Sequence, residues 1–305
     1  MRNALVLGLL VLIAGSACAD THRLNVGGGE VVVTIEPGRL DVSTAQVLRW
    51  VEESAQAVAG YLGRFPVKQV LINISTDGEK GPHNGETHCG EPPLIWITLG
   101  MTTTPADLRT DDVMTHEMVH LMLPNADHGQ QGWAAEGLAT YVEALARLGA
   151  GRLDRTGFWQ LLTKALSKAG GGAAAQGLDA TNAGEQRYWS GALFWMLADL
   201  EIREKTQGQK TLGDALRGIQ KAGGCVSEHW PIEKTLAAAD AAIGVNVLAP
   251  LRARMRASAV GADVPQLLAR LGVQREGSNL AFDDAAPRAG LRRSLETAGL
   301  QFTRR

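Results

Sequence analysis

The chain has 305 residues, of which 45% are hydrophobic and 20% are charged, as in an ordinary globular protein with one large domain or two lobes sharing a cleft. Its formal net charge is −2, so the overall charge favours neither nucleic acid nor an anionic membrane surface as a partner.

Residues 1–19 have the composition of a signal peptide. Arg2 supplies a positive start, the stretch Ala4–Ala14 is almost uninterrupted apolar sequence, and Ala17 and Ala19 form the small-residue pattern of a cleavage site. The apolar run is short for a membrane span. We therefore expect cleavage after Ala19 and an exported protein, either periplasmic or secreted.

The three cysteines leave two questions open. Cys18 is an alternative lipid-anchor position, although Gly15 stands where a lipobox usually has Leu. Cleavage after residue 19 would leave Cys89 and Cys225, which either form one disulfide in an oxidising compartment or remain separate thiols. The chain has no Cys-x-x-Cys pair, which disfavours a cysteine-based zinc site.

Residues 20–110 are expected to form an α/β lobe. A helix is predicted from Ser43, a capping residue, to about Leu62, before Gly63. The Gly-, Pro- and His-rich stretch Asp77–Pro93 is predicted to be a loop. Short strands are predicted at Arg23–Val26, Val31–Ile35, Val67–Ile74 and Leu94–Leu99.

Residues 111–305 are expected to form a mostly helical lobe that carries the functional site. Lys168–Gly177 has low complexity and is predicted to connect two helices. Val264–Gly272 and Ala285–Ala298 have the pattern of amphipathic helices. The fold class expected is α+β, with a small sheet-bearing lobe followed by a helical lobe, and one catalytic unit in the cleft between them.

The motif His-Glu-x-x-His occupies residues 116–120. On a helix, His116 and His120 lie one turn apart on the same face, so both imidazoles can reach one metal ion, with Glu117 beside them. Asp111 and neighbouring polar residues suit the start of such a helix, and Pro124 suits its end. Two surface histidines and a chance glutamate would give the same pattern, so the motif needs support from elsewhere.

That support comes from a second predicted helix that begins near Gly132. Trp133, Glu136, Thr140 and Glu143 share its interior-facing stripe. A buried carboxylate without a partner is costly, and a metal ion is one possible partner. Glu136 would complete a set of two His and one carboxylate around one Zn²⁺ ion, with the fourth position left for water.

These motifs resemble those of the gluzincin zinc metallopeptidases, which include aminopeptidase N-like and glycyl aminopeptidase-like enzymes. The resemblance implies a thermolysin-like zincin fold, metal ligands His116, His120 and Glu136, and Glu117 as general base. A looser match at residues 188–193 implies that the Tyr188 hydroxyl helps to hold the oxyanion; an aromatic anchor for a buried helix is the alternative. The matching residues are His116, Glu117, His120, Trp133, Glu136, Gly137, Ala139, Tyr141 and Glu143.

The chain departs from the family pattern in two ways. Fifteen residues separate His120 from Glu136, a shorter spacer than in the aminopeptidase N-like enzymes, so a distant membership is implied. The Gly-x-Met-Glu-Asn segment that grips a free amino terminus has no clear counterpart, although Gly90-Glu91 and Glu86 lie in a comparable place. Endopeptidase and aminopeptidase activity therefore both stay open.

The sequence thus predicts hydrolysis of peptide bonds in a peptide or protein substrate. The edge strand that pairs with extended substrate is expected to be Leu94–Leu99, from its order along the chain. One alternative is a catalytically silent peptidase-like domain that binds peptide or cell-envelope material. A structural zinc site is disfavoured, because such sites usually have four protein ligands and no fourth is evident.

Overall fold

The computed structural model describes residues 19–125, 131–170, 172–182, 184–261, 263–277 and 279–298. Residues 1–18 of the predicted signal peptide, which include Cys18, lie outside these ranges. Within the described ranges, no helix combines the length and the apolar composition that crossing a bilayer requires.

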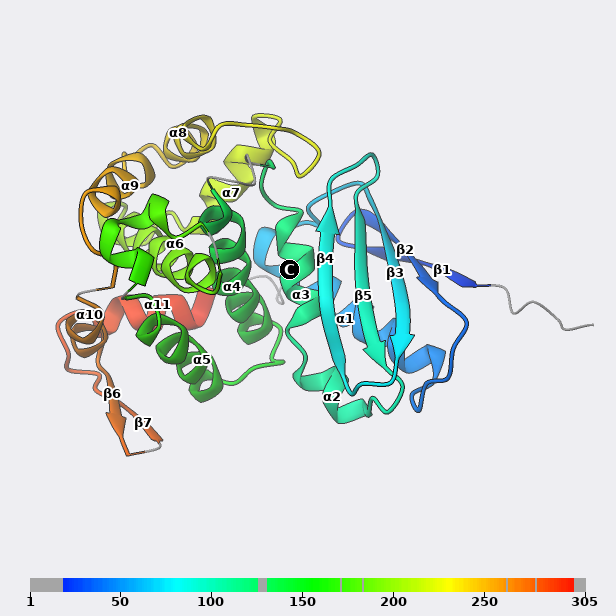
Figure 1. The fold of residues 1–305 in the computed structure, drawn as a ribbon. Coiled ribbons are helices and arrows are strands. Elements are labelled where there is room, and N and C mark those ends of the chain that lie inside the picture. Colours follow the sequence, from blue (N-terminus) through cyan, green and yellow to red (C-terminus); the bar gives the residue numbers. More distant parts are fainter. Residues whose placement is uncertain are drawn as a thin grey trace, which may run out of the picture.

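A five-stranded sheet forms the core of the N-terminal lobe (Figure 1). The strands lie in the order β1-β2-β3-β5-β4; β2, β3 and β5 are parallel, while β1 and β4 are antiparallel to their neighbours at the two edges. The strands are β1 (Asp20–Val26), β2 (Gly29–Ile35), β3 (Gln69–Asp77), β4 (Pro82–His88) and β5 (Leu94–Gly100).

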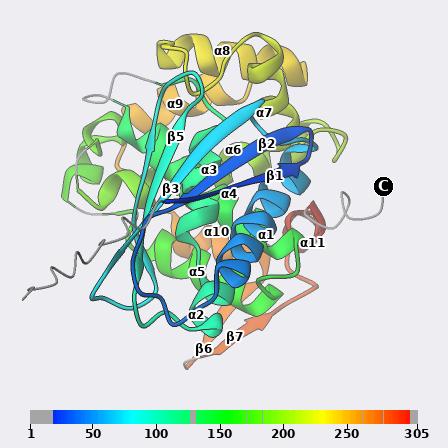
Figure 2. The ribbon, with the colours of Figure 1, turned by 90° about the vertical axis from the view of Figure 1, so that its right-hand side faces the viewer.

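Helix α1 (Thr44–Leu62) covers one face of this sheet (Figure 2). It begins with a capping box between Ser43 and Gln46 and ends at Gly63, whose φ of 86° suits a residue without a side chain. Its apolar side chains pack with the inward-facing side chains of the central strands, such as Ile72 and Ile95, both fully buried. Trp96, on the same strand as Ile95, faces the other way and is 51% exposed.

The predicted loop between β3 and β5 contains an additional strand, and this changes the edge of the sheet. The segment Pro82–His88 forms β4, which pairs antiparallel with β5. The prediction that Leu94–Leu99 is the edge strand is therefore wrong, because β5 has hydrogen-bonded neighbours on both sides. β4 is the edge, with an irregularity between His83 and Glu86 where Asn84 has a φ of 49°.

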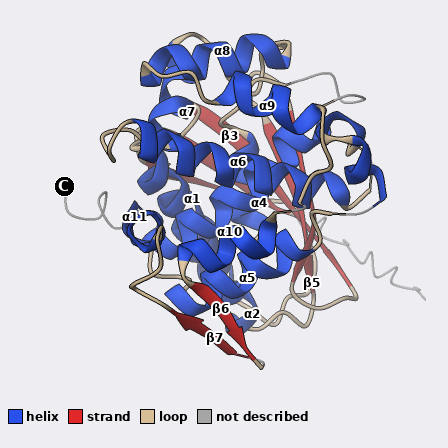
Figure 3. Ribbon diagram, turned by 90° about the vertical axis from the view of Figure 1, so that its left-hand side faces the viewer, coloured by secondary structure: helices blue, strands red, loops and turns tan. Residues whose placement is uncertain are grey.

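The second lobe is built from helices that stack around α4 and α6 (Figure 3). Gly137 and Gly191 let these two helices approach closely: a Cβ on Gly137 would lie 2.2 Å from the backbone of Gly191. The indole N–H of Trp195 donates to the carbonyl oxygen of Ala134 at 2.8 Å and ties the same pair together. The helices that follow the five-stranded sheet along the chain are α2 (Pro105–Thr110), at the end of the first lobe, and then α3 (Val113–His120), α4 (Gly132–Gly149), α5 (Arg155–Ser167), α6 (Gln186–Lys205), α7 (Leu212–Lys221), α8 (Ile232–Ile243), α9 (Leu248–Arg256), α10 (Val264–Leu271) and α11 (Ala289–Ala298), with 3₁₀ turns η1 (Gly172–Gln176) and η2 (Leu178–Ala180).

A small sheet followed by a mostly helical lobe confirms the predicted α+β fold class. The helical lobe also contains a β-hairpin that the sequence reading did not anticipate, made of β6 (Val273–Glu276) and β7 (Asn279–Phe282). Cys89 and Cys225 have free thiols in this structure.

Candidate metal centre

Helix α3 carries the His-Glu-x-x-His motif and is anchored at its first turn by Asp111. The Asp111 carboxylate accepts the backbone N–H groups of Val113 and Met114 at 3.0 and 3.1 Å, and the indole N–H of Trp50 at 2.9 Å. Burial raises the pKa of Asp111 to about 6, although these hydrogen bonds act in the opposite direction. The carboxylate therefore fixes the start of α3 against α1.

The structure brings the three predicted metal ligands together. Nε2 of His116 lies 3.3 Å and Nε2 of His120 lies 3.5 Å from Oε2 of Glu136, which projects from the first turns of α4. One potential ligand atom from each residue falls within 4.8 Å of the others. Two ligand atoms bound about 2.0–2.1 Å from a tetrahedral zinc ion lie roughly 3.3–3.4 Å apart, so the separations fit such an ion.

The electrostatics of the cluster also suit a cation. Burial would raise the pKa of Glu136, but hydrogen bonds with His116 and His120 outweigh burial and hold this pKa far below its usual range. Burial lowers the pKa of His120, yet the attraction of Glu136 and Glu117 is stronger and the net shift is upward. The carboxylates thus create a negative electrostatic potential at the cluster. A divalent cation bound there would be stabilised by this potential, as a proton on the imidazoles would be.

Glu117 lies beside the ligand cluster and also contacts the edge strand β4. Its Oε2 accepts the hydroxyl of Thr87 on β4 at 2.7 Å, and the same hydroxyl lies 2.9 Å from its carbonyl oxygen. A Cβ on Gly85 would lie 2.6 Å from Cγ and 2.7 Å from Oε1 of Glu117. β4 therefore passes closely over Glu117 because residue 85 has no side chain, and Thr87 then orients the carboxylate.

The start of α6 places Tyr188 and Arg187 beside the cluster. The Tyr188 ring lies 6.1 Å from the His116 ring, centroid to centroid, and its hydroxyl accepts a hydrogen bond from Nη2 of Arg187 at 3.1 Å. The same Nη2 lies 3.5 Å from Oε1 of Glu136. Arg187 therefore contacts the Glu136 oxygen that does not face the imidazoles, while Oε2 faces both of them.

Two other residues of the α4 stripe have partners of their own. The Thr140 hydroxyl donates to the carbonyl oxygen of Glu136 at 2.8 Å, a bond within the helix. Glu143 is buried and lies 3.0 Å from Nη1 of Arg147; burial raises the pKa of Glu143 to about 8 against the influence of this guanidinium. An arginine, and not the metal cluster, is thus the partner of Glu143.

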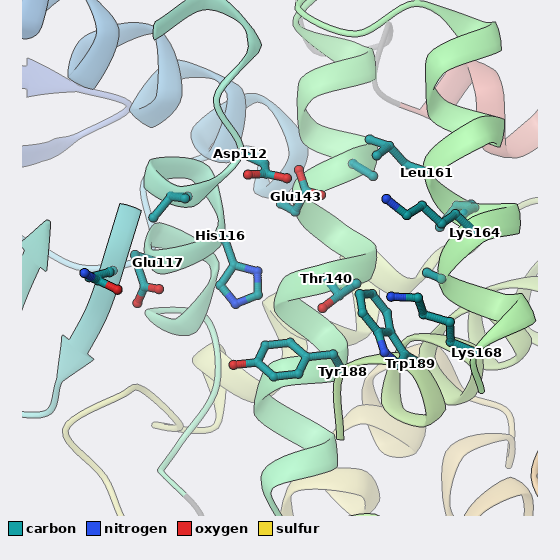
Figure 4. Close-up of a pocket in the computed structure, with 16 residues that line it drawn as sticks. Asp112, His116, Glu117, Thr140, Glu143, Leu161, Lys164, Lys168, Tyr188 and Trp189 are labelled. Carbon is teal, nitrogen blue, oxygen red and sulfur yellow. The ribbon is translucent and has the colours of Figure 1, made fainter. Parts of the chain in front are cut away.

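Two adjoining hollows flank the cluster and share Asn84, Gly85, His116, Glu117 and Tyr188. The α5 hollow, about 420 Å³, is further lined by Asp112, Val113, Thr140, Glu143, Ala144, Leu161, Leu162, Lys164, Ala165, Lys168 and Trp189 (Figure 4). The β4 hollow, about 750 Å³, is further lined by Glu86, Thr87, His88, Cys89, Val119, His120, Leu123, Pro124, Asn125, Gln131, Gly132, Ala135, Glu136, Leu138, Arg187 and Val226. Both volumes lie in the range of small-molecule and peptide side-chain pockets.

Sequence reasoning did not identify Thr87 or Arg187 as site residues. Thr87 lies in the segment predicted to be a loop, and Arg187 precedes the tyrosine on which the motif comparison depends. Glu86, named as a distant counterpart of an amino-terminus binder, lines the β4 hollow with its side chain 69% exposed and lies 3.6 Å from His88. The dipeptide Asn84-Gly85, which directly precedes Glu86, is typical of a turn or irregular backbone. It is the local sequence feature that indicated a break in the chain here, and it did not indicate a strand.

Comparison with known proteins shows the fold. Neither protein-family models nor curated proteins gave a match to the chain. Among solved structures, an aminopeptidase N family protein from Idiomarina loihiensis is similar, with a TM-score of 0.64 and 13% identity over 88% of this chain and 53% of that chain. An M1 zinc metallopeptidase variant from Deinococcus radiodurans bound to a Tyr-Ser-Ala substrate gives a TM-score of 0.51 and 15% identity over 79% of this chain and 52% of that chain. A two-domain M1 zinc metallopeptidase variant bound to L-arginine gives 0.52 and 15%, with the same coverage.

The chain therefore shares its fold with the aminopeptidase N family protein and the M1 zinc metallopeptidase. The chain spans about half the length of these proteins. Identities of 13–15% establish the architecture and leave the chemistry to be argued from the residues of this chain.

Proposed function

We propose that the chain is a zinc-dependent hydrolase of peptide bonds, with one Zn²⁺ ion held by His116, His120 and Glu136. The observation on which the proposal depends is the approach of both imidazole Nε2 atoms to one Glu136 oxygen, at 3.3 and 3.5 Å. This set of two histidines and one carboxylate is typical of catalytic zinc, which keeps a position open. When bound, zinc polarises the scissile carbonyl group and lowers the pKa of water to about 7.

In this proposal Glu117 is the general base and then the general acid. Its carboxylate, oriented by the Thr87 hydroxyl at 2.7 Å, takes a proton from the attacking water and passes it to the leaving amine. Tyr188 lines both hollows, and its hydroxyl would donate a hydrogen bond to the oxyanion of the tetrahedral intermediate. Arg187 keeps the hydroxyl and Glu136 in place by contacting both.

The peptide substrate would lie in extended form beside β4. β4 is an edge strand, so its outward backbone groups are available to pair with an added strand, and residues 84–89 line the hollows beside the cluster. The cleaved bond would then lie beside Glu117, which lines both hollows next to β4.

The test is a digest of a mixed peptide library, read by mass spectrometry, with metal content measured on the same samples. The expected result is one zinc per chain, hydrolysis that a chelator stops and zinc restores, and loss of hydrolysis in Glu117→Gln by about 10²–10⁴-fold with zinc retained. Glu36→Gln, at an exposed position away from both hollows, is the matched control and should keep wild-type rates. A zinc-loaded wild-type protein that cleaves nothing in the library would instead favour a silent peptide-binding domain.

We also propose that the protein is exported, on the strength of the leader-like residues 1–19. Sequencing of the mature N-terminus should find Asp20. A mature chain that begins with a lipidated Cys18 would support the alternative anchor, and a chain that keeps its leader in the cytosol would contradict export.

A further inference from the structure

The α5 hollow combines apolar walls with two positively charged side chains. Helix α5 supplies Leu161, Leu162 and Ala165 to its walls. Lys164 and Lys168, from the same helix, also line it, and Figure 4 shows both amines directed toward α4. The aliphatic part of a lysine side chain can lie along apolar surface while its amine stays near solvent. The hollow therefore has an apolar interior, with two lysine amines at its opening.

Two of the acidic groups that line the hollow lie near the same arginine. Glu143 lies 3.0 Å and Asp112 lies 4.0 Å from Nη1 of Arg147. The Lys168 amine lies 3.8 Å from Glu185, a side chain that is 78% exposed, and 4.7 Å from the centre of the Trp189 ring. The ion pairs among the described residues include none with Lys164. The Lys164 amine, which lines the hollow, is therefore available to a carboxylate of a bound peptide.

We propose that the α5 hollow binds a carboxylate-bearing residue of the substrate, on the C-terminal side of the cleaved bond, through Lys164 and Lys168. This inference rests on the proposed peptidase function. The carboxylate belongs either to a glutamate side chain or to the α-carboxylate of a short peptide, since both present the same charged oxygens to the two amines. The apolar wall favours a glutamate, with its longer stem, over an aspartate.

The geometry of β4 sets the direction. Asn84 and Gly85 line both hollows, whereas residues 86–89 line only the β4 hollow. A peptide that pairs antiparallel with β4 runs from the His88 end toward the Asn84 end, so its later residues reach the α5 hollow. Antiparallel pairing is the more stable and more common arrangement for an added strand.

The test compares peptides that differ at the residue after the cleaved bond, Glu or Gln, each with a free or an amidated C-terminus. Wild-type protein should prefer the carboxylate by about three- to thirtyfold in kcat/KM, and added salt should reduce this ratio. A preference for Glu over Gln that survives amidation identifies the side chain as the ligand, and a preference for the free over the amidated C-terminus identifies the terminal carboxylate. Lys164→Met with Lys168→Met keeps the stems, removes both charges and should bring the ratio close to one.

Lys221→Met is the matched control, because Lys221 is an exposed helix lysine outside both hollows, and it should keep the wild-type ratio. Equal cleavage of all four peptides by wild-type protein, or an unchanged ratio in the double variant, would overturn the inference while leaving peptidase activity in place. If no peptide is cut, binding of the fluorescently labelled Glu and Gln peptides to zinc-loaded protein still tests the hollow. Failure of the proposed function and failure of this inference are thereby distinguished.

Discussion

The hydroxyl of Thr87 lies 2.7 Å from Oε2 of Glu117 and links the edge strand of the sheet to the helix of the His-Glu-x-x-His motif. A hydrogen bond to a carboxylate is stronger than one between neutral groups and fixes the direction of the oxygen that accepts it. The proposed base thus depends on a residue thirty positions earlier in the chain.

Replacement of Thr87 with Val should slow turnover without loss of zinc. Valine has the shape of threonine but cannot donate the hydrogen bond, whose loss to a charged group costs about 1.5–3 kcal/mol. We expect kcat to fall by roughly 10- to 100-fold. Thr87→Ser keeps the hydroxyl and should stay near wild type; a Val variant with unchanged kcat would show that Thr87 does not position Glu117.

A Gly85→Ala variant should lose activity through displacement of Glu117. The added Cβ would lie 2.6 Å from Cγ of Glu117 and 2.8 Å from Cγ1 of Val113, so β4 and α3 must move apart. Zinc content should stay near wild type, because the ligands lie on α3 and α4. Gly60→Ala is the control: it is a helix position with nothing within 4 Å of the added atom, and it should not reduce activity.

The variant Arg187→Met, which lacks the guanidinium group, should bind zinc about 10- to 100-fold more weakly than wild type. Its guanidinium contacts Oε1 of Glu136 at 3.5 Å and so holds the ligand carboxylate in one orientation. Competition with a chelator measures the affinity. Tyr188→Phe provides the contrast, since it should keep the affinity and reduce turnover; equal zinc affinity in Arg187→Met and wild type would contradict a positioning role.

Glu143 should make the folded state less stable as the pH rises. Burial raises its pKa from 4.5 to about 8, so between these values the folded protein binds a proton that the unfolded chain has lost. The free energy of unfolding then falls with pH, by up to about 1.4 kcal/mol per pH unit.

Denaturant unfolding at several pH values between 5 and about 8.5 measures this effect as the difference between wild type and Glu143→Gln. The neighbouring Asp111, Asp112 and Arg147 are present in both proteins, so their contributions largely cancel. A difference that does not change with pH would show that Glu143 stays ionised beside Arg147.

The ligand set was accessible from the sequence because it depends on helical periodicity. His116 and His120 are one turn apart, and Glu136 lies on the interior stripe of the next long helix. The sequence also predicted helix α1 with its cap at Ser43, because caps and stripes are local properties.

The sequence did not predict which segments far apart in the chain lie next to each other; the tertiary structure shows this. β4 has the sequence Pro-His-Asn-Gly-Glu-Thr-His, in which Pro, Asn and Gly disfavour a strand. Its hydrogen bonds to β5 nevertheless make it a strand and move the edge of the sheet away from Leu94–Gly100. Glu143 and Glu136 share one sequence stripe, yet one lies beside Arg147 and the other beside two imidazoles.

By itself, then, the sequence determined which residues can bind a metal, since spacing along a helix fixes which side chains share a face. The tertiary structure decided what surrounds them: the strand over Glu117, the arginine behind Glu136, and the lysines across from α4. Those neighbours come from elements far apart in the chain, and their proximity depends on packing, which no local pattern encodes.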